Sequence, residues 1–141
     1  MRLLLSTLLA VLAATAQAAD NRAADLVARA FTCQLPDGQA PKVIEALHAL
    51  HAAPGRDADD FVLPTPILVF GLPVTRVNAA PSGGEGPDSY IAILPGAKLQ
   101  GVASAAGLAP SNVGFKRESA SGTLMADVHD RTDVWLSCTP R

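Results

Sequence analysis

Apolar residues recur at intervals of three and four positions in three stretches of the chain, a spacing that predicts three helices with one buried face each. The stretches cover residues 20–30, 41–53 and 99–106. Residues that start or stop helices stand at their ends. Asp20 or Asn21 caps the first helix. Pro41 suits the first turn of the second helix, and Gly107 ends the third.

Elsewhere the pattern changes to short runs of β-branched and aromatic residues separated by turn residues, which predicts strands. The runs lie at 61–63, 67–70, 74–77, 89–94, 113–118, 123–128 and 133–138. Pro64, Pro66 and Pro73 confine the first runs to edge strands or strand ends, because proline cannot donate to a sheet ladder. The last three runs follow one another through short turns, which argues against a doubly wound parallel sheet. The sequence therefore predicts an α+β fold, a mainly antiparallel sheet with two to three helices packed on one face.

Residues 79–88 form the most distinct loop, with three glycines and two prolines. Ten residues exceed the roughly two to five that are usual for hairpins, and loops of unusual length are either functional or flexible links. Ser82, Glu85 and Asp88 offer polar contacts to a partner, and Tyr90 is an aromatic residue of the type enriched at interfaces. These four residues are the candidate binding site. A flexible link without a binding role is the alternative.

The N-terminus is typical of a cleaved secretory signal peptide covering residues 1–18. Arg2 precedes an apolar run of about 12 residues, and Ala16-Gln17-Ala18 has the small-x-small pattern of a cleavage site. A membrane-spanning helix needs roughly 20 apolar residues, so we expect no membrane span. Cleavage leaves residues 19–141 as one expected domain. The Ala-rich, Arg-over-Lys composition favours a bacterial periplasm as its location.

The only two cysteines, Cys33 and Cys138, predict one intramolecular disulfide, because an exported protein folds in an oxidising compartment. In the chain-entropy model, closing a loop of about 100 residues stabilises a protein by roughly 4.7 kcal/mol. A reactive thiol and a metal thiolate pair are the alternatives. Neither has the Cys-x-x-Cys spacing that those functions favour.

Charge and aromatic content disfavour several kinds of partner. The chain carries 11 basic and 13 acidic residues, for a formal net charge of −2. Charges of one sign form no long run, which argues against nucleic acid and anionic membranes as partners. The one Trp, one Tyr and four Phe are scattered, which disfavours a stacking platform for bases or sugars.

The strongest candidates for metal binding are Glu45, His48 and His51. On a helix the two histidines lie about 60° apart on the flank of the apolar face, and Glu45 points away from the core. A metal site needs at least a third ligand. The sequence offers only His129 or the acidic stretch 57–60, which does not match a calcium loop. We therefore expect neither a metal nor a cofactor.

The sequence lacks the short motifs that hold a catalytic serine, since it contains neither Gly-x-Ser-x-Gly nor Ser-x-x-Lys. Residues 82–86 lack the Lys-Ser/Thr ending of a phosphate-binding loop. Asp127 and Asp130 flank His129 and could in principle orient it as a general base. The residues lie at an expected hairpin turn, however, where polar side chains are usual.

The preferred hypothesis is an exported, non-catalytic periplasmic protein that binds another periplasmic or secreted protein, as an inhibitor or immunity protein does. One alternative is a metal-handling protein that uses His48 and His51. The other is a small hydrolase whose residues assemble only in the folded chain.

Overall fold

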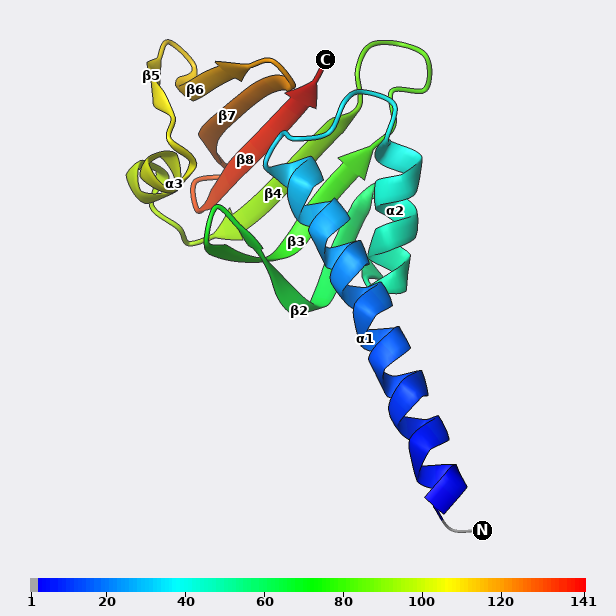
Figure 1. Cartoon of the computed structure of the whole chain (residues 1–141). Helices are drawn as coiled ribbons and strands as arrows, with labels where there is room; N and C mark the ends of the chain where they lie inside the picture. Colours follow the sequence, from blue (N-terminus) through cyan, green and yellow to red (C-terminus); the bar gives the residue numbers. More distant parts are fainter. Residues whose placement is uncertain (1–2) are drawn as a thin grey trace.

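The computed structural model describes residues 3–141, with side chains from residue 16 onward. Its elements in chain order are α1 (Leu3–Phe31), α2 (Ala40–Ala49), β1 (Ala53–Pro54), β2 (Asp60–Val69), β3 (Leu72–Ala80), β4 (Ser89–Pro95), α3 (Leu99–Ala106), β5 (Ala109–Ser111), β6 (Gly114–Ser119), β7 (Gly122–His129) and β8 (Asp133–Pro140). The strands form one eight-stranded antiparallel sheet in the spatial order β1-β2-β3-β4-β8-β7-β6-β5 (Figure 1). This confirms the predicted α+β fold.

One face of the sheet forms the hydrophobic core. Successive residues of a strand point to opposite faces, and the ladders place Val77, Ala92 and Leu136 side by side on the inner face, all fully buried. The helices contribute buried residues to the same core, namely Val27, Phe31, Val43, Leu47, Val102 and Ala106. The helices therefore cover this face. Among the elements that the structure describes, none covers the opposite face, as is common for antiparallel sheets.

Helix α1 begins at Leu3, well before the predicted start at Asp20. The preceding stretch is rich in Ala and Leu, which favour helices, and it contains neither Gly nor Pro to interrupt one. Residues 16–22 are exposed, and Ala23 is the first of the described side chains to be buried. The first half of α1 therefore extends away from the sheet (Figure 1), and it contains the predicted cleavage site.

Arg2, the charge of the predicted signal peptide, lies outside the described residues. Within residues 3–141, no helix combines the length and the hydrophobicity needed to cross a membrane.

Helix α2 ends at Ala49 rather than near Ala53 as predicted, and Ala53–Pro54 instead pairs with β2. The physical reason is a left-handed cap. His51 has a φ of 60°, and its backbone N–H donates to the carbonyl of His48. The N–H of Ala52 donates to the carbonyl of Leu47, which completes a Schellman motif and turns the chain out of the helix.

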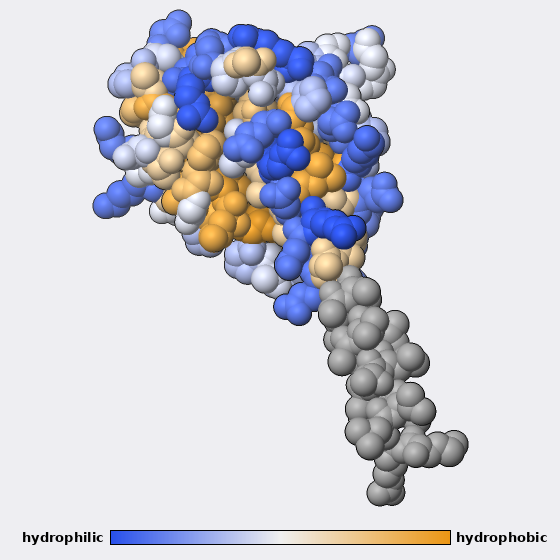
Figure 2. Space-filling view, viewed as in Figure 1, coloured by the Kyte–Doolittle hydropathy of each residue, from blue (hydrophilic) through white to orange (hydrophobic). Residues whose placement is uncertain are grey.

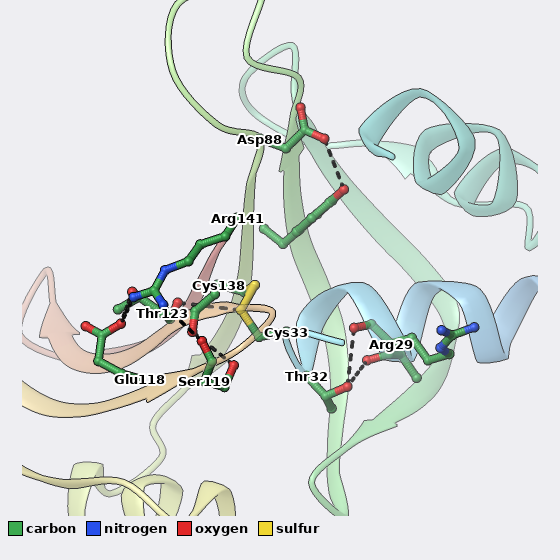
Figure 3. Close-up of a disulfide and its surroundings, with 12 residues drawn as sticks. Arg29, Thr32, Cys33, Asp88, Glu118, Ser119, Thr123, Cys138 and Arg141 are labelled. Atoms are coloured by element: carbon green, nitrogen blue, oxygen red, sulfur yellow. Dashed lines mark hydrogen bonds and ion pairs between the residues drawn. A yellow bond between two sulfur atoms is a disulfide. The ribbon is translucent and has the colours of Figure 1, made fainter. Parts of the chain in front are cut away.

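The predicted disulfide is confirmed. It joins Cys33, just after α1, to Cys138 on β8, which follows 105 residues later (Figure 3). Both cysteines are buried, and Cys138 shares the inner face of β8 with Val134 and Leu136. The bond therefore ties the end of the first helix to a central strand of the sheet.

Candidate functional site

The loop between β3 and β4 projects from one end of the sheet, at the upper right of Figure 1. The strands pair as far as Ala80 and Ser89, so the ladder stops where the loop starts. Residues 81–87 are exposed, except for the partly exposed Ser82. In the space-filling view the loop consists mostly of pale residues of intermediate hydropathy (Figure 2). It presents backbone groups and polar atoms rather than apolar surface.

Glycines determine the shape of the loop tip. Gly83, Gly84 and Gly86 have φ angles of 60°, 90° and 92°, a region that residues with a Cβ adopt only at a cost. The Oγ of Ser82 accepts from the N–H of Gly84 at 3.3 Å, and its carbonyl accepts from the N–H of Glu85 at 3.1 Å. Ser82 thus shapes the turn, and Glu85 is the charged side chain that the tip presents to solvent.

Asp88, at the base of this loop, is the only polar residue in the buried set of described residues, with 2% of its surface exposed. Its Oδ1 accepts from the N–H of Ser82 at 3.1 Å. Its Oδ2 accepts from the N–H of Ala40 at 2.9 Å and from the hydroxyl of Tyr90 at 3.4 Å. Its own N–H donates to Asp37 Oδ1 at 2.8 Å. Asp88 therefore binds the base of the loop to the segment before α2.

The bond from Ala40 has a second consequence, because Ala40 is the first residue of α2. N–H groups in the first turn of a helix have no partner within the helix, and the helix dipole favours a negative charge there. Gln39, at the N-cap position, makes no side-chain cap. The carboxylate of Asp88, 48 residues away in sequence, serves as the cap instead.

Tyr90 lies in the core, with none of its surface exposed. Its ring packs edge-on against Phe31, with 5.8 Å between ring centres. Burial, and next the neighbouring Asp88 carboxylate, raise the pKa of the Tyr90 hydroxyl well above its usual value. Asp88 and Tyr90 were expected to contact a partner, but both side chains face inward. Of the four candidate residues, only Ser82 and Glu85 lie on the surface of the loop.

The structure does not place the two histidines in the expected helical arrangement. His48 lies in α2 and packs edge-on against Phe61, with 5.7 Å between ring centres. His51 follows the end of the helix and lines a separate hollow of about 270 Å³ beside Pro64 and Ile67. Among the described residues, no group of three or more His, Cys, Asp or Glu side chains is arranged to hold a metal ion.

A groove on the uncovered face of the sheet was missed by the sequence analysis. We call it the outer groove. Its volume is about 450 Å³. It is lined mainly by Asp60, Arg76, Asn78, His129, Asp133 and Trp135. Strand alternation alone predicts that some of these residues point outward, but their proximity depends on which strands are neighbours, and the sequence does not reveal that order.

Comparisons of the chain with protein-family models, with curated proteins and with solved structures find no match.

Proposed function

We propose that this chain is an exported, non-catalytic periplasmic protein that binds another periplasmic or secreted protein through the loop at residues 81–87, as an inhibitor or immunity protein does. The observation that carries the proposal is the buried carboxylate of Asp88 at the base of the loop. Burying a charge is costly unless several donors satisfy it. The bonds to Asp88 fix the base of the loop, while the tip stays exposed.

A rigid base with an exposed tip is the arrangement that binding loops use. Binding residues are often found on loops held by a rigid scaffold. Here the scaffold consists of β3, β4 and the start of α2, all bonded to the base of the loop. The tip presents Glu85 and the N–H and C=O groups of a glycine-rich turn, which suit polar contacts with a protein surface.

Export is supported by two features of the fold. The disulfide between Cys33 and Cys138 is the kind of bond that persists in oxidising compartments. In addition, α1 contributes buried side chains from Ala23 onward, so the loss of residues 1–18 removes none of the core contacts seen for the described side chains. The metal-handling alternative gains no support from the described residues, among which no group of three or more His, Cys, Asp or Glu side chains is arranged to hold a metal ion.

The test is capture of partners from periplasmic extract with the tagged mature protein and with two variants. The first variant is Glu85→Lys. The second replaces residues 81–87 by Asn-Gly, the dipeptide preferred in tight hairpins. We expect both to lose the captured partner, with affinity falling by about tenfold or more for Glu85→Lys.

The matched control is Glu45→Lys, which makes the same charge change on the exposed side of α2. It should retain the partner at the affinity of the wild type, and thermal unfolding should show that all variants remain folded. If the folded loop variants retain every partner at equal affinity, the loop is only a link and the proposal is wrong.

A further inference from the structure

The outer groove brings together residues from distant parts of the chain. Arg76 on β3 pairs with Ile93 on β4, and Ile93 pairs with Trp135 on β8, so the three residues form one row across the sheet. Because strand residues alternate between faces, this row lies on the face opposite the core residues Val77 and Ala92. Ile93, which is only 7% exposed, also lines the outer groove and lies between two strands that carry polar residues.

Some of the charged and polar groups of the outer groove already contact one another. The Asn78 amide donates to Asp60 Oδ1 at 2.8 Å. An Arg76 nitrogen lies 3.6 Å from Asp133 Oδ2. Only the contact between Arg76 and Asp133 joins opposite charges, because Asn78 is neutral, and the lining as a whole has four carboxylates and two guanidinium groups. The guanidinium groups and the carboxylates have hydrogen-bonding capacity left, since each has more donors or lone pairs than these contacts use.

One side of the outer groove is a stacked pair of rings. His129 lies over Trp135, with 3.7 Å between ring centres and 25° between the planes. His129 Nε2 also lies 3.6 Å from Asp130 Oδ2. Asp130 and Arg131 both have left-handed backbones, with φ angles of 50° and 67°. These two residues lie in the turn that joins β7 to β8, where left-handed conformations are common, and the turn places His129 beside Trp135.

These features restrict the class of ligand. An anion would be repelled by the four carboxylates of Asp57, Asp60, Asp130 and Asp133, and a cation would lie beside the guanidinium groups of Arg56 and Arg76. A neutral molecule with many hydroxyls avoids both conflicts, because each hydroxyl donates to a carboxylate and accepts from a guanidinium or amide. The stacked rings of Trp135 and His129 add an aromatic surface, which suits the C–H face of a sugar ring.

We propose that the outer groove is a binding site for a neutral saccharide. The sugar ring contacts the side formed by Trp135 and His129, and its hydroxyls bond to Asp133, Arg76 and Asn78. The volume of about 450 Å³ lies within the range of small-molecule sites. The scattered aromatic residues of the sequence do not exclude this role, since a single ring beside polar partners is sufficient.

The experiment uses the mature disulfide-bonded protein, and its reporter is built into the chain. Trp135 is the only tryptophan, so tryptophan fluorescence and the single indole N–H cross-peak in a ¹H–¹⁵N spectrum report on the outer groove alone. The probes are glucose, maltose, cellobiose and N-acetylglucosamine, with arginine and glutamate as charged probes. We expect at least one saccharide to shift both signals with a Kd of about 1 mM or tighter, and we expect no response to either amino acid.

Asp133→Asn and Asn78→Ala remove groups that line the outer groove, and each should weaken saccharide binding by about tenfold. The matched control is Asp25→Asn, the same carboxylate-to-amide change at an exposed position of α1, which should leave the affinity unchanged. Glu85→Lys should also leave it unchanged, because Glu85 is not among the residues that line the outer groove. No response to any saccharide, a response to arginine or glutamate instead, or equal saccharide affinity in the groove variants would overturn the proposal.

Discussion

The carboxylate of Asp88 holds three parts of the chain together: the β3–β4 loop, the start of α2 and the hydroxyl of Tyr90. All three groups donate to it, so both oxygens are needed as acceptors. An asparagine of the same size would point an NH2 group at one of these donors. At this position the charge and the shape of the side chain are therefore both required.

Asp88→Ala should lower the free energy of unfolding by roughly 3 kcal/mol, because it leaves buried donors without an acceptor. Asp88→Asn should lower it by a similar amount. Urea unfolding followed by circular dichroism measures both changes. Asp59→Asn, at a partly exposed position, is the control and should change the free energy by less than about 0.5 kcal/mol. A loss in Asp88→Asn no larger than the control's would show that the carboxylate is not an essential acceptor.

Tyr90 makes the stability of the protein depend on pH in the alkaline range. Its pKa in the folded protein is raised above 10.0, the value of the free side chain, so the folded state keeps the proton longer than the unfolded state does. The stabilisation from this shift is therefore fully present below pH 10 and is lost as the pH rises further. We expect the urea midpoint to fall more steeply above pH 10 in the wild type than in Tyr90→Phe.

The chain offers a direct check, because Tyr90 is its only tyrosine. Tyrosinate absorbance should develop at higher pH in the folded protein than in the protein unfolded in urea. Coincident titration curves would contradict the assigned burial and contact with Asp88.

At the scale of elements, the C-terminal end of α2 illustrates how a cap overrides a periodic pattern. Apolar spacing continues past Ala49, but His51 takes a left-handed conformation and the helix stops. A residue with a Cβ pays a steric cost there that glycine avoids.

His51→Gly should therefore raise the free energy of unfolding by about 0.5–1 kcal/mol, after allowing for the entropy that glycine loses on folding. His48→Gly, the matched variant inside the helix, should lower it by a similar amount. Thermal and urea unfolding measure whether each variant raises or lowers the free energy of unfolding. A loss of stability in His51→Gly would mean that its side-chain contacts outweigh the backbone cost.

Both edges of the sheet are formed by very short strands. β1 has two residues, β5 has three, and Pro54 and Pro110 lie in them. Short strands and prolines hinder pairing with another chain. Binding by addition of a strand at the edges is thus disfavoured, and the loop and the outer groove remain as the candidate contact regions.

At the scale of the whole molecule, the disulfide links two segments that lie near opposite ends of the sequence. It closes a loop across 105 residues, so in the chain-entropy model it restricts the unfolded state strongly.

A Cys33→Ala, Cys138→Ala double variant should lose about 3–5 kcal/mol of stability. Urea unfolding with and without a reducing agent measures this loss. Reduction should destabilise the wild type and leave the double variant unchanged. Equal stability of the two proteins under oxidising conditions would show that the bond contributes little.

Removal of residues 1–18 should leave the stability of the fold nearly unchanged, because burial among the described side chains of α1 begins at Ala23. A chain of residues 19–141 and the full chain should differ by less than about 0.5 kcal/mol. A chain that begins at residue 28 lacks the buried Val27 and should lose at least about 1.5 kcal/mol.

For export itself, intact mass should show a mature chain beginning at Ala19, and a product that retains Met1 would contradict the predicted cleavage.

The sequence by itself determined the local features of this protein. Apolar spacing located the parts of the three helices that pack on the core, glycines and prolines located the β3–β4 loop, and the count of two cysteines fixed the disulfide. The helices and the loop depend on residues that are close together in the sequence, and the disulfide follows from the presence of only two cysteines. The sequence alone is therefore sufficient to predict them. Periodicity could not reveal the early start of α1, because its N-terminal part extends away from the sheet (Figure 1).

Only the tertiary structure decided which way Asp88 and Tyr90 point and which residues line the outer groove. Strand β4 is apolar on both faces, with Tyr90, Ala92 and Leu94 on one face and Ile91 and Ile93 on the other, so alternation did not identify the inner face. The row from Arg76 to Trp135 requires β4 to pair with β8, far along the chain. Strand order and register follow from the packing of the whole core, and no local stretch of sequence contains that information.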